Sequence, residues 1–450
     1  MRERPAEICI TGVTPEGYGV GRGEDGKVVF VPDTAPGDRV RAGIIKELKN
    51  SSVARLEEII IPSPLRVIPD CRVCRKCGGC VFRHISYEAE AEIKRGFVRE
   101  AFARIGGMDI EVGEVRRGSE LYYRNKVQYP FARSENGNCV FGYYARRSHR
   151  VIVHEKCLLQ DQSFYDVAAF CAAGADEAGI KAYDEQTREG TLRHIVMRRS
   201  REGKMLVCLV VNGGADAVLP LAEKIYNGFH FVTGVHINKN SRRDNVIFGE
   251  ETFRAAGEEY LTDVLCGKKF ALSPRSFYQV NAEMAERLYS HAAKLASGAG
   301  GRVILDLYCG VGTVGLCVAG KNDKLCGVEI IPEAVEDARR NAKLNGRSES
   351  GTHFVCGDAA LGVKECEKRF GRPDVIIVDP PRKGLEREVI ETVVSAAPEK
   401  IIYISCDPAT LARDCAIFAP LGYTANKAAP FDLFPRTGHV ETVVLMSRGG

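Results

Sequence analysis

Five short apolar runs in the C-terminal part of the chain restrict its fold more than any other sequence feature. From about residue 266 onward the runs RVILDLY, KLCGVEI, THFVCGD, DVIIVDPP and KIIYIS alternate with helix-like stretches. One stretch, PEAVEDARRNAKLNG, has Pro332 at its start and Gly346 beyond its end, which suits helix boundaries. This alternation predicts a doubly wound, Rossmann-like α/β sheet, closed by an antiparallel strand in HVETVVLMSR. Ligands of such sheets bind at the carboxyl ends of the strands.

The chain before residue 266 predicts two further domains. Residues 1–62 contain short strand-like runs separated by glycines, with a hairpin turn at Asp25-Gly26. This pattern predicts a small closed β-barrel of the oligonucleotide-binding type. Residues 63–265 predict a central α+β domain, with a helix in ISYEAEAEIKRGFVREAFARIGG and β-hairpins over residues 121–155. The doubly wound domain is expected to occupy residues 266–450.

Composition bounds the class of protein. Of the 450 residues, 45% are hydrophobic and 27% charged, as in ordinary soluble domains. Neither the N-terminal sequence MRERPAEICI nor any later apolar run has the length of a membrane-spanning segment. Seventeen cysteines, several of them in strand-like runs, suit a reducing compartment. We therefore expect a cytoplasmic protein that does not enter a membrane.

A glycine-rich motif follows the first of the five runs. ILDLYCGVGTVG places Gly310, Gly312 and Gly315 in G-x-G-x-x-G spacing after a strand, where the backbone can approach a nucleotide-like ligand. Glu329 ends the next run, 23 residues after Asp306, where a carboxylate can accept hydrogen bonds from ribose hydroxyls. The pattern fits a dinucleotide or S-adenosylmethionine. The alternative is a glycine turn without a ligand.

The sequence DVIIVDPPRKG helps to separate the two ligands. Asp379-Pro380-Pro381 forms a rigid turn with few backbone donors at the end of a strand. Dehydrogenases do not need such a turn, whereas many base-modifying methyltransferases carry Asn/Asp-Pro-Pro at the corresponding strand. The alternative is a proline-rich surface loop.

Cys406 allows two interpretations. It lies in ISCDPATLARD, between an apolar run and a helix-like start. Most free cysteines are buried and inert, which favours a core residue. A cysteine that follows a strand end can also be a nucleophile presented at the rim of a sheet. The residues around Cys406 alone leave both interpretations open.

Four cysteines form a cluster in CRVCRKCGGC: Cys71, Cys74, Cys77 and Cys80, each three positions apart. This spacing is similar to the C-x2-C-x2-C runs of ferredoxins. Zinc sites more often pair two C-x2-C units across a long loop. The cluster therefore favours an iron–sulfur site over zinc, and zinc over reduced thiols without metal.

Positive charge and aromatic rings are combined in the region after this cluster. Between Arg66 and Lys156 there are 18 Lys and Arg against 11 Asp and Glu. The hairpins carry Tyr122-Tyr123-Arg124 and, further along, Arg146, Arg147, His149 and Arg150. A surface of this kind can stack unpaired bases and hold phosphates, as single-stranded RNA requires. The alternative is a hairpin with aromatic side chains inside and solvated arginines outside.

Five motifs occur in order along the chain: SFYQVN (276–281), DLYCGVGT (306–313), DPPRKG (379–384), SCDPATLARD (405–414) and FPRTGHVE (434–441). Together they resemble the RNA uracil-5-methyltransferase family, specifically its iron–sulfur-containing branch. The segment GYGVGRGEDGKVVFVPDTAPGDRV resembles the TRAM domain of those enzymes. The resemblance covers nearly the whole chain. It implies a class I methyltransferase sheet preceded by a TRAM barrel.

The resemblance also implies the roles of six residues. Carbon 5 of uracil is a weak nucleophile, but a thiolate that adds to carbon 6 makes it reactive enough to take a methyl group. A base must then remove the carbon-5 proton so that the thiolate can leave. The nucleophile is Cys406, the base is Glu441, and the S-adenosylmethionine contacts are Gln279, Tyr308, Glu329 and Asp379. His439 is either a supporting or a purely structural residue.

The iron–sulfur branch uses a C-x5-C-x2-C pattern and one distant cysteine. By resemblance, this pattern matches Cys71, Cys77, Cys80 and Cys157, and Cys74 is extra. We therefore expect a [4Fe–4S] cluster on these four thiols. Methyl transfer is not a redox reaction, so the cluster is expected to support the structure or RNA binding.

The sequence as a whole predicts methylation of uridine carbon 5 in RNA, with 23S ribosomal RNA as the expected substrate and transfer RNA as the alternative. An iron–sulfur, nicotinamide-dependent oxidoreductase would explain the glycine motif and the cysteines, but not SCDPATLARD or DPPRKG. A non-catalytic RNA-binding protein would explain the barrel and the hairpins, but not Cys406 with Glu441. Nothing in the sequence indicates an obligate protein partner.

Overall fold

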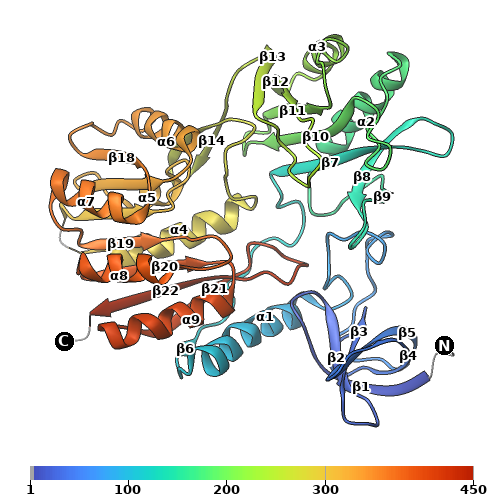
Figure 1. Cartoon of the computed structure of the whole chain (residues 1–450), viewed down its shortest axis with the longest axis horizontal. Helices are drawn as coiled ribbons and strands as arrows, with labels where there is room; N and C mark the ends of the chain where they lie inside the picture. The colour runs from blue at the N-terminus through green and yellow to red at the C-terminus, as the bar shows by residue number, and fades with distance from the viewer. Residues whose placement is uncertain (1–4, 299, 449–450) are drawn as a thin grey trace.

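A closed five-stranded barrel forms the N-terminal part of the chain, blue in Figure 1. The computed structural model describes residues 5–298 and 300–448. Alternating side chains of the strands, among them Ile8, Val31 and Val40, fill the barrel core. The predicted small barrel is thereby confirmed. Its strands, in the order β1-β2-β3-β5-β4, are β1 (Pro5–Val13), β2 (Tyr18–Arg22), β3 (Val28–Pro32), β4 (Arg39–Glu47) and β5 (Ser51–Ile61).

A seven-stranded mixed sheet follows, drawn in green in Figure 1. Apolar residues of two helices pack on one of its faces and form a separate core with Val207, Leu209 and Ile237. The helices are α2 (Gln162–Glu177) and α3 (Leu219–Gly228). The strands, in sheet order, are β13 (Glu251–Gly257), β12 (Val232–Lys239), β11 (Met205–Val211), β10 (Leu192–Arg199), β7 (Lys126–Arg133), β8 (Cys139–Tyr144) and β9 (Val151–Val153).

The C-terminal part is a doubly wound sheet of eight strands, as predicted. Five parallel strands occupy one side, and the order in which the chain adds strands to the sheet reverses between β16 and β19, where ligands of such sheets bind. The strands, in sheet order, are β18 (Thr352–Cys356), β17 (Lys324–Glu329), β16 (Val303–Leu307), β19 (Val375–Val378), β20 (Lys400–Ser405), β22 (Glu441–Arg448), β21 (Tyr423–Phe431) and β6 (Glu111–Val112).

Helices cover both faces of this sheet, and each face has its own apolar core. One face is covered by α4 (Ala282–Ala296), α5 (Thr313–Val318) and α6 (Pro332–Leu344). The other is covered by α7 (Ala359–Phe370), α8 (Arg387–Ser395) and α9 (Pro408–Phe418), which continues into the 3-10 turn η2 (Ala419–Leu421). A two-stranded ribbon, β14 (Leu261–Leu265) and β15 (Lys268–Leu272), precedes α4.

The predicted central unit, residues 63–265, is divided between the two sheets. Helix α1 (Tyr87–Ala101), with the π-helical turn η1 (Phe102–Gly106), buries Val98 and Phe102 in the core of the eight-stranded sheet. Strand β6 then extends that sheet by pairing with β21. Figure 1 shows α1 beneath α9 and β21, between the barrel and the doubly wound sheet. The apolar residues at the end of α1 pack there, whereas α2 and α3 cover one face of the seven-stranded sheet.

No helix in the described part of the chain is long and apolar enough to cross a membrane.

Candidate active site

The predicted site residues of the doubly wound sheet meet at one edge. Tyr308 follows β16, Glu329 ends β17, Asp379 follows β19 and Cys406 follows β20. These four strands are parallel neighbours, so their carboxyl ends lie side by side. Strand β22 runs in the opposite direction and begins at Glu441. Its first residue therefore lies at the same edge as the last residues of the other strands.

Strand register places the nucleophile candidate beside the base candidate. Ser405 of β20 pairs with Thr442 of β22, so the next residue along β20, Cys406, meets the position of Glu441. The two side chains also interact, because the charge of Glu441 raises the pKa of the Cys406 thiol. Burial, followed by the charges of Glu441 and Asp379, raises the pKa of this thiol to about 11, and the charge of Arg382 opposes the rise. In the chain alone, Cys406 is therefore a thiol at neutral pH.

Glu441 is a buried acid with a strongly raised pKa. Its exposed fraction is 4%. Burial raises the pKa of Glu441 to about 8, nearby Asp379 contributes in the same direction, and Arg382 opposes them. The pKa of Asp379 is also raised by burial, to about 7. A carboxylate with a pKa near 8 is a much stronger proton acceptor than an exposed glutamate, which suits a general base.

The glycine-rich turn forms a cradle around Glu329. The backbone N–H of Gly310 donates to Glu329 Oε2 at 3.1 Å, and the N–H groups of Ile330 and Ile331 donate to Oε1 at 2.8 and 3.0 Å. Tyr308 has a φ of 64° and Gly310 one of 54°, so the backbone turns sharply here. The carboxylate is thereby fixed at the ligand-binding edge of the sheet.

Asp306 is a site residue whose role the sequence did not reveal. It is 1% exposed, and its Oδ2 accepts from Gly315 N at 2.8 Å, which closes the glycine turn. Burial raises its pKa to about 8, and Asp379 and Glu329 contribute in the same direction. Asp306 therefore lies between the carboxylates of β17 and β19. The signal available in the sequence was an acid within an otherwise apolar strand.

Arg382 and His439 form a second pair beside Glu441. Arg382 Nη2 lies 3.1 Å from His439 Nε2, and the ring of Phe434 contacts the imidazole edge to face. Burial and the charge of Arg382 lower the pKa of His439 to about 4, so the imidazole is neutral. Sequence reasoning missed Arg382, although it belongs to the DPPRKG motif. Both residues lie on loops that border the candidate base.

Gln279 lies outside the strands of the doubly wound sheet. It is buried on the segment that leads into α4, whose N-cap is Asn281. Asn125 holds this segment: its side chain donates to the carbonyl of Gln279 at 3.0 Å, and its backbone N–H donates to the carbonyl of Val280 at 2.8 Å. Residues next to the first hairpin strand, β7, therefore set the position of a predicted cofactor contact.

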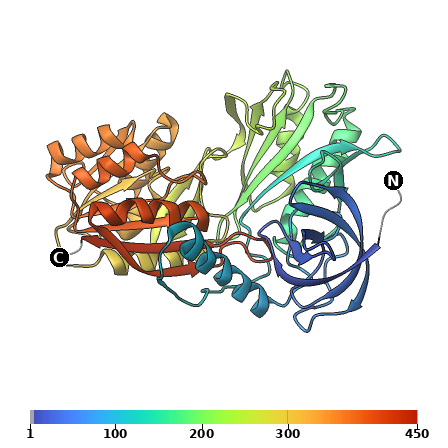
Figure 2. The ribbon, with the colours of Figure 1, turned by 60° about the horizontal axis from the view of Figure 1, so that its bottom comes forward.

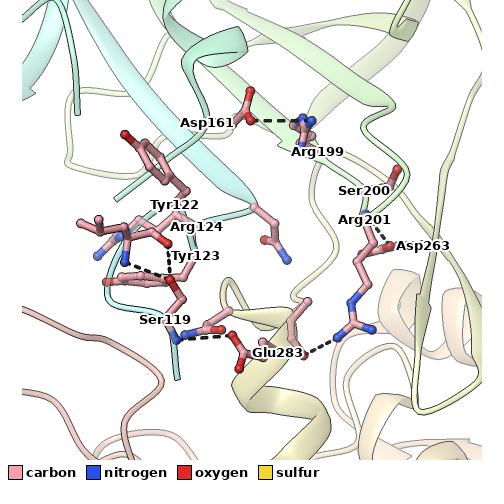
Figure 3. Close-up of a pocket in the computed structure, with 14 residues that line it drawn as sticks. Ser119, Tyr122, Tyr123, Arg124, Asp161, Arg199, Ser200, Arg201, Asp263 and Glu283 are labelled. Atoms are coloured by element: carbon pink, nitrogen blue, oxygen red, sulfur yellow. Dashed lines mark hydrogen bonds and ion pairs between the residues drawn. The ribbon is translucent and has the colours of Figure 1, made fainter. Parts of the chain in front are cut away.

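A pocket of about 570 Å³ opens where β7 and β10 approach α4. Figure 3 shows Tyr122, Tyr123 and Arg124 on one side, and Arg199 and Arg201 on the other. Arg199 pairs with Asp161 at 3.7 Å, and Arg201 N donates to Asp263 at 3.0 Å. Nε of Arg124, Nε of Arg199 and Oδ1 of Asn125 are buried with no hydrogen-bond partner among the described residues. The pocket thus combines cations, aromatic rings and unsatisfied polar atoms.

The four cysteines predicted to bind the cluster, Cys71, Cys77, Cys80 and Cys157, are near one another, but their side chains are not arranged to coordinate a metal ion. Cys80 has a pKa raised to about 12, first by burial and then by Cys157 and Cys77. Charges of Cys71 and Cys77 likewise raise the pKa of Cys157. The charges that raise the pKa of Cys74 are instead Cys71 and Asp33 of the barrel. Among the described residues, no group of three or more His, Cys, Asp or Glu side chains is arranged to hold a metal ion.

Known proteins similar to this chain decide its family. Family models described as "tRNA (Uracil-5-)-methyltransferase", "TRAM domain" and "Methyltransferase small domain" match residues 365–449, 4–56 and 285–402. A Clostridium tetani protein described as an uncharacterized RNA methyltransferase is 39% identical over 98% of this chain and 96% of its own. The chain belongs to the RNA uracil-5-methyltransferase family.

Other RNA methyltransferases agree with this assignment. A Halalkalibacterium halodurans relative with the same kind of description is 38% identical over 98% of this chain and 96% of its own. The Pyrococcus abyssi tRNA (uracil-54, C5)-methyltransferase, solved with S-adenosyl-L-homocysteine, has a TM-score of 0.78 and 26% identity, with 98% and 100% of the chains covered. The predicted family, enzyme class and class I methyltransferase fold are confirmed. None of these matches supports the nicotinamide-dependent oxidoreductase alternative.

Proposed function

We propose that this RNA uracil-5-methyltransferase forms 5-methyluridine with Cys406 as the nucleophile and Glu441 as the base. The observation that carries the proposal is the register of β20 and β22, which sets the Cys406 thiol beside a buried carboxyl group. The two residues have complementary tasks. A thiol can add to an electron-poor ring carbon, and a carboxylate with a pKa near 8 can accept a proton from carbon.

Gln279, Tyr308, Glu329 and Asp379 are proposed to hold S-adenosylmethionine. The fit is supported by the glycine turn: a Cβ added to Gly310 meets no atom within 4 Å, so the turn faces open space. Glu329 has its carboxylate fixed by backbone N–H groups at the edge of this space, where it can accept hydrogen bonds from a ribose. When bound, the cofactor supplies an electrophilic methyl group.

Cys406 must lose its proton before it can add to carbon 6 of uracil. Asp379 is the neighbouring acceptor for this proton, because its pKa of about 7 leaves part of it ionised near neutral pH and Glu441 must stay a free carboxylate for the later proton removal. The new S–C6 bond moves the electrons of the C5=C6 double bond toward the carbon-4 carbonyl, which makes carbon 5 nucleophilic.

Glu441 acts after carbon 5 has been methylated. Its carboxylate takes the carbon-5 proton, the electrons of the C–H bond restore the C5=C6 double bond, and the S–C6 bond breaks. Burial keeps water away from this carboxylate, so the proton acceptor is the side chain itself. The thiolate that leaves is then available for the next cycle.

The pocket of Figure 3 is proposed to bind RNA next to the reacting uridine. Its arginines can contact phosphates, and the half-exposed ring of Tyr122 can stack on an unpaired base. Asn125 lies in the same pocket and holds the Gln279 segment, which places the pocket next to the proposed cofactor site.

Residues 71–80, with Cys157, are proposed to hold a [4Fe–4S] cluster on Cys71, Cys77, Cys80 and Cys157. The chemistry of the donor set supports this. The thiols interact with one another, and Gly79 N donates to Cys77 Sγ at 3.4 Å. Burial raises the pKa of Cys80 and of Cys157, and the charge of Arg124 opposes this rise. The cluster would hold the cysteine segment against the proposed RNA-binding hairpins. The backbone of Cys77 already forms an isolated β-bridge with Ala145 of these hairpins.

For the substrate, 23S ribosomal RNA is our first candidate, because the TRAM domain and the cysteine run together resemble the iron–sulfur branch. Transfer RNA is the second candidate, favoured by the similarity to the Pyrococcus abyssi enzyme that acts on tRNA uracil-54. Mass-spectrometric mapping of 5-methyluridine in both RNA classes, from cells with and without the gene, separates the two. Loss of 5-methyluridine from neither class would contradict the proposed function.

A further inference from the structure

The loop of residues 432–440 joins β21 to β22 and ends directly before Glu441. In Figure 2 this red segment extends from the doubly wound sheet toward the blue barrel. It has no regular secondary structure, yet Asp432, Pro435 and Arg436 are buried. A loop without regular structure needs other contacts to fix its path. Those contacts set the path by which the chain passes His439 and enters β22 at Glu441.

A buried lysine of α1 is at the centre of these contacts. Lys94 is 0% exposed, and its Nζ donates to Glu90 Oε1 at 2.7 Å, to Asp432 Oδ1 at 2.8 Å and to the carbonyl of Phe434 at 3.2 Å. All three donor positions of the ammonium group are therefore used. Two of the three acceptors belong to the loop. One side chain of α1 thus fixes the first turn of the loop.

Arg436 fixes the middle of the same loop. Its backbone N–H donates to Glu90 Oε1 at 2.7 Å, and its guanidinium donates to the carbonyl of Ile85 at 2.8 Å and to Glu120. The φ of Arg436 is 71°, a conformation that side chains other than glycine rarely adopt. Its carbonyl accepts from the backbone N–H groups of Val81 and Phe82 at 2.8 and 3.2 Å. The loop is thereby connected to the segment that follows the cysteines.

Each of the other structural units also contacts this loop. The Tyr123 hydroxyl donates to the carbonyl of Pro435 at 3.0 Å, and the Asn281 side chain donates to the carbonyl of Leu433 at 3.2 Å. A Cβ on Gly438 would overlap the carbonyl oxygen of Pro15 in the barrel. The barrel, the segment that follows the cysteines, α1, the hairpin region and the N-cap of α4 therefore converge on the nine residues before the base.

We propose that Lys94, together with Glu90, Asp432 and Arg436, forms a positioning network that sets the place of Glu441 for the elimination step. Burying several charges costs desolvation free energy, and apolar side chains of similar volume would hold the helix and the loop together at least as tightly. Directed hydrogen bonds differ from apolar packing because they select one loop conformation. The inference rests on the proposed function, since it takes Glu441 as the base.

A network that only stabilised the fold would have a different signature from one that positions the base. Loss of stability alone lowers the amount of active enzyme and slows every step equally. Displacement of Glu441 slows only proton removal from carbon 5, so the covalent complex between enzyme and methylated RNA persists. The amount of this complex that survives denaturing electrophoresis measures elimination separately from addition and methyl transfer.

The test compares Lys94→Met with Arg302→Met in the full-length enzyme. Arg302 forms a largely buried ion pair with Asp323 at 2.6 Å, next to the amino end of β16 and away from Cys406. It is therefore a matched control for loss of a buried cation. Each variant is assayed 15 °C below its own Tm, with unmodified RNA and saturating S-adenosylmethionine. We expect Lys94→Met to accumulate at least tenfold more covalent complex than wild type, and Arg302→Met to behave as wild type.

Three further results complete the test. If Lys94→Met does not fold, Asp432→Asn is tested instead, because it keeps the size of the side chain and removes one charge. It is expected to raise the amount of covalent complex about threefold. Wild-type amounts of complex in the variant that folds, or an equal rise in Arg302→Met, would overturn the proposal.

Glu441→Gln is run in parallel. If it accumulates complex while the network variant does not, the proposed function stands and the positioning role is lost. If it turns over normally, the base assignment and the inference fail together.

Discussion

The edge of the sheet that carries Cys406 and the segment that carries Cys71 to Cys80 place their thiols by different means. At the sheet edge, backbone pairing between β20 and β22 fixes the neighbours of Cys406 residue by residue. Segment 71–80 contains turns, bends and one isolated β-bridge, which pairs Cys77 with Ala145. It is held from outside by few bonds, such as Gly78 N to Tyr144 O at 3.1 Å and Arg146 Nη2 to Cys80 O at 3.0 Å.

This difference teaches what each site depends on. The sheet edge is specified by hydrogen bonds between backbones, so it persists when a single side chain is removed. The cysteine segment lacks such a scaffold, and its thiols are neighbours without forming a metal-binding group among the described residues. We therefore expect side-chain replacements to have local effects at the sheet edge and regional effects in the cysteine segment.

The largest expected effect is the loss of activity in Cys406→Ala. Removal of the nucleophile should lower kcat by about 10³-fold or more. Because strand pairing fixes the site, S-adenosylmethionine binding and Tm should stay close to wild type, which calorimetry and thermal denaturation can check. Cys415→Ala, in the neighbouring helix α9, is a control that removes a buried thiol without chemistry. Activity above a tenth of wild type in Cys406→Ala would make Cys406 a core residue.

The next largest effect concerns iron binding by the cysteine segment. Anaerobically purified protein should contain about four irons per chain, as a [4Fe–4S] cluster requires. Cys157→Ser should lose nearly all of this iron and should increase proteolysis within residues 71–80, because the segment then lacks its main support. Cys74→Ser should keep both iron and protection. Iron loss in Cys74→Ser with retention in Cys157→Ser would assign the ligands to the local run instead, and stoichiometric zinc without iron would contradict the cluster.

The sequence predicted the site residues whose positions follow from strand pairing, and it missed the contacts between residues that are far apart in the chain. Tyr308, Glu329, Asp379 and Cys406 each follow or end an apolar run, and parallel pairing necessarily gathers such positions at one edge. The short motifs around them carried the signal for their roles. Local pattern was sufficient because the backbone alone sets this geometry.

The contacts around the loop before Glu441 could not be predicted in this way. Lys94 and Asp432 are 338 positions apart, and no periodicity of α1 shows that its buried face includes a lysine with a partner in the loop after β21. The same limit explains why α1 and β6 were assigned to the central unit instead of the doubly wound sheet. Arg382 was within a recognised motif, but only the fold shows that it lies beside both Cys406 and Glu441.

A smaller effect concerns the pocket between the hairpin region and α4. Tyr122 is 49% exposed, and its replacement by Ala should weaken RNA binding by about 5- to 150-fold, since a stacked base contributes about 1–3 kcal/mol. S-adenosylmethionine affinity should not change, because Tyr122 does not hold the Gln279 segment. Tyr226→Ala, an exposed tyrosine on α3 outside the pocket, is the matched control. Equal losses in both variants would remove the pocket from the RNA-binding surface.

The smallest effect tests the electrostatics of the sheet edge through stability. Glu441 has a folded-state pKa of about 8, above the ordinary value of 4.5, so the folded chain holds a proton that the unfolded chain has released between these pH values. The stability of the fold therefore falls as pH rises from 4.5 to 8. Glu441→Gln removes this dependence, and its Tm should exceed that of wild type by a few degrees at pH 8.5 but not at pH 4.5.

Glu386→Gln is the control, because Lys383 lowers the pKa of that exposed carboxyl group. Removal of the Glu386 charge should therefore not raise the Tm at pH 8.5. A Glu441→Gln enzyme without the gain at pH 8.5 would show that the carboxyl is ionised at little cost, and the raised pKa of the base would then be wrong.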